Sequence, residues 1–204
     1  MVAVALTAFA AALGAQLVDR VIAVVSGTVI MLSDARAAIA LGLFDPGAAR
    51  DPIEAAMRWL IDRQLVIDEA GRGDRVEVDP DALGAAIDGA RQRFPSEDAY
   101  RRALAECGLD DRTAVRLVRD TLAARSYVER RFDSMLPPTE EELREYHADH
   151  RARFVRNGRQ LTFEDALADV TAVLQQERRA QAVSAWMERL RRRADIREVY
   201  RVPR

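Results

Sequence analysis

Hydrophobic residues repeat at helical spacing along most of the chain, and β-branched stretches lie near its two ends, with one further brief extended piece predicted at 76–78. Apolar positions three or four residues apart indicate amphipathic helices, in which one face is buried against a core. This spacing predicts helices over residues 52–70, 80–94, 96–107, 110–135 and 162–194. The chain is therefore expected to be mostly α-helical.

Several helices are predicted to begin at a polar residue suited to cap them. Asp51 and Asp79 are each followed by proline, which fits the first helical position because no backbone donor is needed there. Thr139 and Glu142 form the Thr-x-x-Glu pattern of a capping box at the start of another helix. Ser33 is expected to cap a short helix that follows the first β-branched stretches.

The β-branched stretches predict a small sheet. Residues 18–25 and 28–32 flank a Ser26-Gly27 pair, a pattern typical of a β-hairpin. Residues 196–202 alternate apolar and polar side chains, as in a half-buried strand. A lone strand needs a partner for its backbone hydrogen bonds. We therefore expect the C-terminal strand to pair with the N-terminal hairpin beside the helical body.

The first residues have the pattern of an export signal. Residues 1–13 are apolar and uncharged, and the small residues Gly14 and Ala15 follow them. The run is too short for a membrane span and ends like a signal-peptidase site, so residues 1–15 are predicted to be a signal peptide. No Lys or Arg precedes the run, and a buried N-terminal helix is the alternative interpretation.

The rest of the chain, residues 16–204, is expected to form one domain with three parts. Residues 16–136 supply an N-terminal core, and a Leu-Pro-Pro break at its end leads into a connecting helix and turn over 137–160. Residues 161–204 supply the closing helix and strand. The closing helix is polar on every face at 175–179, where we expect it to cross solvent or to bend.

Composition and charge weigh against several kinds of chemistry. The formal net charge is −2, which gives no support for a nucleic-acid partner. Cys107 is the single cysteine, so neither an internal disulfide nor a cysteine zinc cluster is expected. His147 and His150 lie one helical turn apart, but a zinc site needs a further ligand, and a solvated helix end is the preferred interpretation. No catalytic residue, metal site or cofactor is predicted, because the sequence contains no P-loop or nucleophile-elbow pattern.

The order of these segments resembles that of the SurA-like periplasmic chaperones, which are related to parvulin-type foldases. The matching segments are the hairpin that leads into Ser33 and Asp34, the helix at 60–66 followed by 76–79, the Pro-Thr-Glu-Glu-Glu start at 138–142 and the closing segment 163–202. The resemblance implies a multi-helix body like the SurA N-terminal domain, a small sheet and a periplasmic location.

The chain departs from that family at one point. In the family a parvulin domain stands between a helix that ends at a phenylalanine, here Phe154, and the closing helix. Only residues 155–161 separate the two in this chain, and Asn157-Gly158 forms a polar turn within them. A parvulin fold cannot fit in that connection, so the chain is not expected to be an enzyme.

The resemblance implies an ATP-independent holdase for unfolded outer-membrane or secreted polypeptides, without a cofactor, a nucleic-acid partner or stable membrane insertion after processing. Such a protein needs accessible apolar surface. The alternative is a non-catalytic adaptor or dimerisation module that binds one folded envelope partner. Candidate peptide-binding residues lie at helix ends and breaks, with ordinary core packing as the competing interpretation for each: Phe44, Trp59, Phe94, Met135, Leu136, Tyr146 and Phe154.

Overall fold

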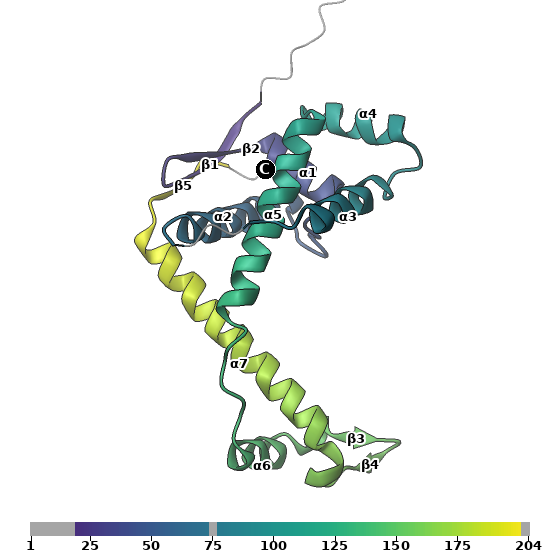
Figure 1. The fold of residues 1–204 in the computed structure, drawn as a ribbon, viewed down its shortest axis with the longest axis vertical. Helices are drawn as coiled ribbons and strands as arrows, with labels where there is room; N and C mark the ends of the chain where they lie inside the picture. The colour runs from purple at the N-terminus through teal and green to yellow at the C-terminus, as the bar shows by residue number, and fades with distance from the viewer. Residues whose placement is uncertain (1–18, 74–76, 201–204) are drawn as a thin grey trace, which may run out of the picture.

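The computed structural model describes residues 19–73 and 77–200, so the predicted signal peptide lies outside it. Within these ranges the chain forms seven α-helices, a three-stranded sheet and a two-stranded hairpin, which confirms the predicted mostly helical fold (Figure 1). None of the helices in the described ranges is long and apolar enough to cross a membrane.

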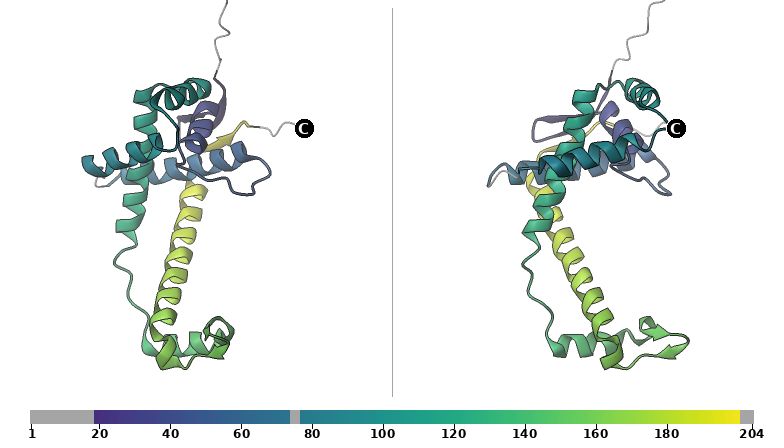
Figure 2. Two further views of the ribbon diagram at one scale, coloured as in Figure 1. Left: turned by 90° about the vertical axis from the view of Figure 1, so that its right-hand side faces the viewer. Right: turned by 45° about the vertical axis from the view of Figure 1, so that its right-hand side comes forward.

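Two bodies share one long helix, as Figure 2 shows most clearly. The larger body, the head, contains β1 (Val21–Val25), β2 (Thr28–Met31), α1 (Leu32–Ala40), α2 (Pro52–Ala70), α3 (Pro80–Arg91), α4 (Glu97–Cys107), α5 (Asp111–Arg131) and β5 (Ile196–Glu198). The smaller body, the second lobe, contains α6 (Glu140–Asp149), a 3-10 turn (Arg151–Arg153), β3 (Val155–Arg156) and β4 (Arg159–Gln160). The shared helix is α7 (Phe163–Arg193).

The sheet has the strand order β2-β1-β5 and is antiparallel throughout, which confirms the predicted pairing of the two chain ends. Ser26 and Gly27 have φ angles of 48° and 90°, so the hairpin turn uses the left-handed region at both central residues. β5 is shorter than the predicted strand and ends at Glu198. The amides of Val199 and Tyr200 still donate to the Ile22 carbonyl, at 2.9 and 3.0 Å.

Most of the predicted caps are confirmed, and one is wrong. The Asp51 carboxylate accepts from the amides of Ile53 and Glu54 at 2.9 and 3.0 Å. Ser33, by contrast, does not cap α1, because it is buried inside the helix and its hydroxyl donates to Asp19 at 2.5 Å. The helix begins two residues earlier than a Ser33 cap predicts, with Met31 at the cap position and its amide donating to the Asp34 carboxylate at 2.9 Å.

Two helices end earlier than their apolar spacing predicts. α3 ends at Arg91, before Phe94. α5 ends at Arg131 rather than at Met135, and Phe132, directly after it, packs edge-on against Trp186 with ring centroids 5.6 Å apart. Residues 132–139 then form a non-helical linker, in which the two prolines favour extended backbone in the residues before them.

The helix α7 contributes to two separate hydrophobic cores. Its first half packs Ala166, Val170 and Leu174 into the core of the second lobe. Its second half packs Trp186 and Leu190 into the core of the head. The polar stretch predicted at 175–179 lies between these halves, and the helix stays continuous through it. The closing helix therefore connects the two bodies rather than completing a single core.

The short connection between Phe154 and α7, too short for a parvulin domain, is a small hairpin. β3 and β4 are two residues each, and Asn157 and Gly158 form the turn between them with φ angles of 53° and 74°. The sequence predicted the turn but not the strands. The Leu161 amide donates to the Phe154 carbonyl at 3.0 Å, so the two ends of this connection lie directly together.

In the second lobe, one carboxylate both completes the capping box of α6 and forms an ion pair with α7. The Arg178 guanidinium lies 2.5 Å from the Glu142 carboxylate, which also accepts from the Thr139 amide at 2.7 Å. The contact with Arg178, followed by the Thr139 amide, lowers the pKa of Glu142 from 4.5 to about 2.

We expect this carboxylate to make the stability of the protein sensitive to acid. Because its pKa is lowered on folding, its contribution is present above the unfolded value of 4.5 and is lost as the pH falls toward about 2. Thermal unfolding followed between pH 6 and pH 2 should show a shallower acid decline for Glu142→Gln than for the parent. Glu141→Gln, at an exposed neighbouring position, should decline as the parent does, and parallel curves for all three proteins would contradict the assignment.

Candidate functional site

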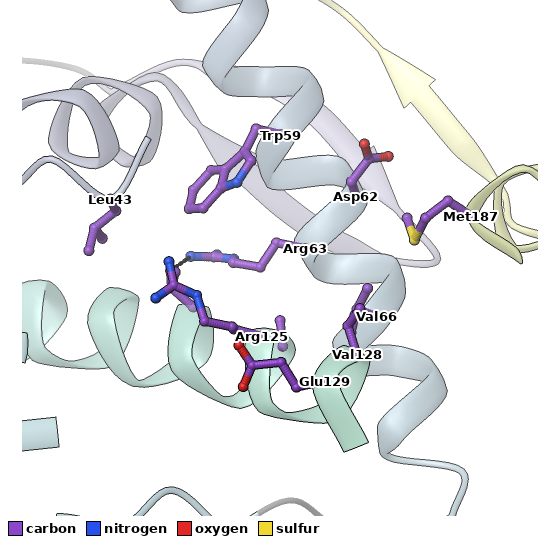
Figure 3. Close-up of a pocket in the computed structure, with 11 residues that line it drawn as sticks. Leu43, Trp59, Asp62, Arg63, Val66, Arg125, Val128, Glu129 and Met187 are labelled. Carbon is purple, nitrogen blue, oxygen red and sulfur yellow. Dashed lines mark hydrogen bonds between the residues drawn. The ribbon is translucent and has the colours of Figure 1, made fainter. Parts of the chain in front are cut away.

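The head carries an open cleft of about 360 Å³ between α2, α5, α7 and the loop after α1 (Figure 3). Apolar side chains form most of its wall, and charged side chains lie among them. The residues that line it are Leu43, Trp59, Asp62, Arg63, Val66, Thr121, Ala124, Arg125, Val128, Glu129 and Met187.

Helical spacing brings these side chains onto one surface. Trp59, Arg63 and Val66 lie three or four residues apart, so α2 presents them on the same face. The α5 residues from Thr121 to Val128 follow the same spacing and face them. Met187 reaches the cleft from α7, which packs on α2. The cleft thus exists only because two helices distant in sequence both pack against α2.

An aromatic stack fixes the apolar wall. The Trp59 ring stacks on the Phe44 ring, with centroids 5.6 Å apart and an interplanar angle of 29°. Trp59 also contacts Arg63, whose guanidinium carbon lies 5.7 Å from the centroid of the Trp59 ring, within the range of a cation–π interaction. Phe44 therefore supports Trp59 from outside the set of lining residues, and both remain only partly buried.

Arg63 is a desolvated cation within this wall. Its Nη1 donates to the Leu117 carbonyl and the Thr121 hydroxyl, each at a long 3.4 Å, and its buried Nε has no hydrogen-bond partner. Burial lowers the pKa of Arg63, against the opposing charges of Asp120 and Asp34. Burial also raises the pKa of each of those two carboxyl groups.

The Asp62 carboxylate pairs with Arg191, a residue that does not line the cleft. The carboxylate receives two hydrogen bonds from Arg191 on α7, at 2.8 and 2.5 Å. Arg193 similarly contacts Glu69, also between α7 and α2. These pairs hold the second half of α7 beside α2 and so help to fix the side of the cleft that carries Met187.

A second apolar surface lies on the linker between α5 and α6. Leu136 is 88% exposed and Met135 is 41% exposed. Both border a smaller hollow of about 180 Å³ against α7, together with Phe132, Asp133, Gln175, Arg178 and Arg179. This surface is separate from the cleft, since no lining residue is common to the two.

The seven candidate residues from the sequence therefore fall into different places. Trp59 lines the cleft and Phe44 supports it, while Met135 and Leu136 form the linker surface. Phe94 packs edge-on against Tyr100 in the head, with ring centroids 5.6 Å apart.

Two of the candidates lie inside the second lobe. Tyr146 and Phe154 are only 9% and 4% exposed, and they form part of its core with Leu143. As packed, they offer almost no surface to a peptide, so core packing is the interpretation that fits these two positions.

The histidine pair is divided between two environments. His147 is buried between Phe154 and Phe163, with ring centroids 5.4 and 5.9 Å away, which is not the solvated position expected for it. His150 stacks on Tyr146 at 4.1 Å. Within the described ranges no cluster of three or more potential metal ligands occurs.

The arrangement can be compared with known proteins. No protein-family model and no curated protein matches this chain. Among solved structures, it is similar to a chain described with two SurA-like chaperones of Campylobacter jejuni, the virulence factor PEB4 and the periplasmic protein Cj1289. The TM-score is 0.55 at 12% identity, over 89% of this chain and 99% of the other. The likeness shows that this chain has a SurA-like fold.

Proposed function

We propose that this protein is an ATP-independent periplasmic chaperone that holds unfolded polypeptides through the head cleft. The observation that carries the proposal is the open, mainly apolar cleft between α2, α5 and α7 in a SurA-like fold. The similar chain is described with two SurA-like chaperones, one of which is described as periplasmic.

The cleft suits clients that vary in sequence. Unfolded chains expose apolar and aromatic side chains, and a cavity of about 360 Å³ is at the small end of the range for ligand pockets. Met187 supports adaptability, because an unbranched thioether side chain can follow different shapes. Leu136 and Met135 offer a second apolar contact, so a long client could touch the protein at two places.

The proposed activity does not include prolyl isomerisation. The connection between Phe154 and Phe163 consists mainly of two short strands and their turn. The Leu161 amide donates a hydrogen bond to the Phe154 carbonyl, so the ends of this connection lie together. This observation supports a chaperone that binds without catalysis.

Aggregation of an unfolded barrel protein tests the proposal. Denatured outer-membrane barrel protein is diluted into buffer without ATP, and light scattering is followed with increasing amounts of the purified protein. We expect scattering to fall at a modest molar excess, with no acceleration of isomerisation in a proline-peptide assay. Undiminished scattering at every ratio would count against the chaperone, and measurable isomerisation would count against the non-catalytic part.

A second function, an adaptor for one folded envelope partner, is favoured by the linker surface. Leu136 is nearly fully exposed, and a fixed partner would remove that side chain from water. Crosslinking in the periplasm separates the two functions, because an adaptor yields one stoichiometric partner and a holdase yields many clients.

A further inference from the structure

Two arginine side chains from different helices line the head cleft. Arg63 comes from α2 and Arg125 from α5, and Figure 3 shows both reaching toward the same side of the cleft, beneath Trp59 and near Leu43. Within the described ranges, neither guanidinium group has a carboxylate oxygen within 4.0 Å. Two cations without an ion-pair partner in a mainly apolar cleft favour an anionic ligand group.

The acidic groups around the cleft do not satisfy these cations directly. Asp62 is bonded to Arg191, and Figure 3 shows its carboxylate directed away from Arg63 and Arg125. Glu129 lines the cleft one turn after Arg125. Asp34 on α1 and Asp120 on α5 attract Arg63, while Arg116 on α5 repels it, all from beyond ion-pair distance.

The donors of Arg63 are incompletely used. Its two hydrogen bonds are long, and their acceptors are the Leu117 carbonyl and the Thr121 hydroxyl. That hydroxyl itself donates to the same Leu117 carbonyl at 2.8 Å. Hydrogen bonds from a guanidinium to a carboxylate are shorter and stronger than such neutral contacts. A carboxylate in the cleft would give Arg63 and Arg125 the charged acceptor that they lack within ion-pair distance among the described residues.

We propose that the head cleft binds the C-terminal carboxylate of a client chain, with the apolar side chain of the last residue against Trp59, Val128 and Met187. This inference rests on the proposed function and names the part of the client that the cleft takes. A C-terminal residue carries its carboxylate and its side chain on one carbon atom, and the cleft offers cations and an apolar wall within about 360 Å³.

Matched peptides test the inference. Three fluorescently labelled peptides share one apolar sequence ending in leucine: the first has a free C-terminal carboxylate, the second a C-terminal amide, and the third the amide with an internal aspartate beside the leucine. Binding to the intact protein is measured by fluorescence anisotropy. We expect the free acid to bind about tenfold to a hundredfold more tightly than the amide, the range of a charge-assisted hydrogen bond. The aspartate peptide should bind like the amide.

Variants assign the preference to the two arginines. Arg63→Gln and Arg125→Gln should each reduce the preference for the acid, and Arg125 is exposed, so its replacement should leave the fold intact. Arg58→Gln is the matched control on α2, because Arg58 is exposed and pairs with Glu54 outside the cleft. Its preference for the acid should equal that of the parent.

The outcomes separate this inference from the proposed function. Equal binding of acid and amide by a protein that suppresses aggregation would overturn the inference and leave the chaperone standing. Tight binding of the aspartate peptide would also overturn it, since any carboxylate would then suffice. Failure to bind any of the peptides, together with failure to suppress aggregation, would overturn the chaperone itself.

Discussion

Replacing Trp186 with alanine is expected to lower the free energy of unfolding by about 3–5 kcal/mol, the usual cost of removing a buried tryptophan. Trp186 is 2% exposed and contacts the ring of Tyr127 on α5 and that of Phe132 directly after it, with centroids 6.1 and 5.6 Å away. The Arg131 guanidinium covers its ring at 5.2 Å. The substitution leaves a cavity at the place where α7 joins the head.

Urea unfolding followed by far-UV circular dichroism measures this loss. Leu167→Ala is the control on the same helix, because Leu167 is 41% exposed and its truncation should cost less than about 1 kcal/mol. An equally small loss for Trp186→Ala would mean that α7 is not anchored to the head through this residue.

Replacing Trp59 with alanine is expected to weaken client binding by at least about tenfold. Trp59 supplies the largest apolar side chain of the cleft, and tryptophans in such positions often contribute 2 kcal/mol or more to binding, by the order of magnitude known from alanine scans. Binding of a labelled unfolded client is measured by anisotropy. Trp59→Phe should restore most of the affinity, because an aromatic ring can again stack on Phe44.

The linker surface provides the comparison for this experiment. Leu136→Ala removes the most exposed of the large apolar side chains in the described ranges without disturbing a core. We expect it to change client affinity less than Trp59→Ala does, with both unfolding midpoints recorded so that loss of fold is not mistaken for loss of binding. A larger effect of Leu136→Ala would indicate that the linker carries the main binding surface, and it would favour the adaptor function.

The elements of the fold could be predicted wherever a local signal decides them. Asp51 and Thr139 satisfy the first amides of their helices with their own side chains, so a few neighbouring residues determine each start. Ser33 shows where such a signal fails. Its hydroxyl has a distant partner in Asp19, and that tertiary contact overrides the capping preference.

The helix ends and the division into two bodies could not be predicted, because they depend on contacts between segments that are distant in the sequence. The apolar stripe of α5 runs on to Phe132, but the helix ends at Arg131, and Phe132 packs against Trp186 of α7. Likewise, apolar spacing along α7 shows that both halves are buried, but not that they are buried in different cores.

The candidate site was predicted only in part for the same reason. Trp59 stands out in the sequence as a large apolar residue, and Val128 was recognised as part of a helical stripe. Arg63 and Met187 gave no sequence signal, because an arginine on a helix is normally solvated and a methionine is normally core. They become site residues only when α5 and α7 are placed against α2.

Site-specific photo-crosslinking tests most directly whether unfolded clients occupy the head cleft. A photoreactive residue replaces Val128 inside the cleft, Leu136 on the linker or Leu167 on the second lobe, and each protein is irradiated with a labelled unfolded client. We expect strong crosslinks from position 128, weaker ones from 136 and few from 167. Equal yields from positions 128 and 167, or crosslinks from 136 alone, would contradict it.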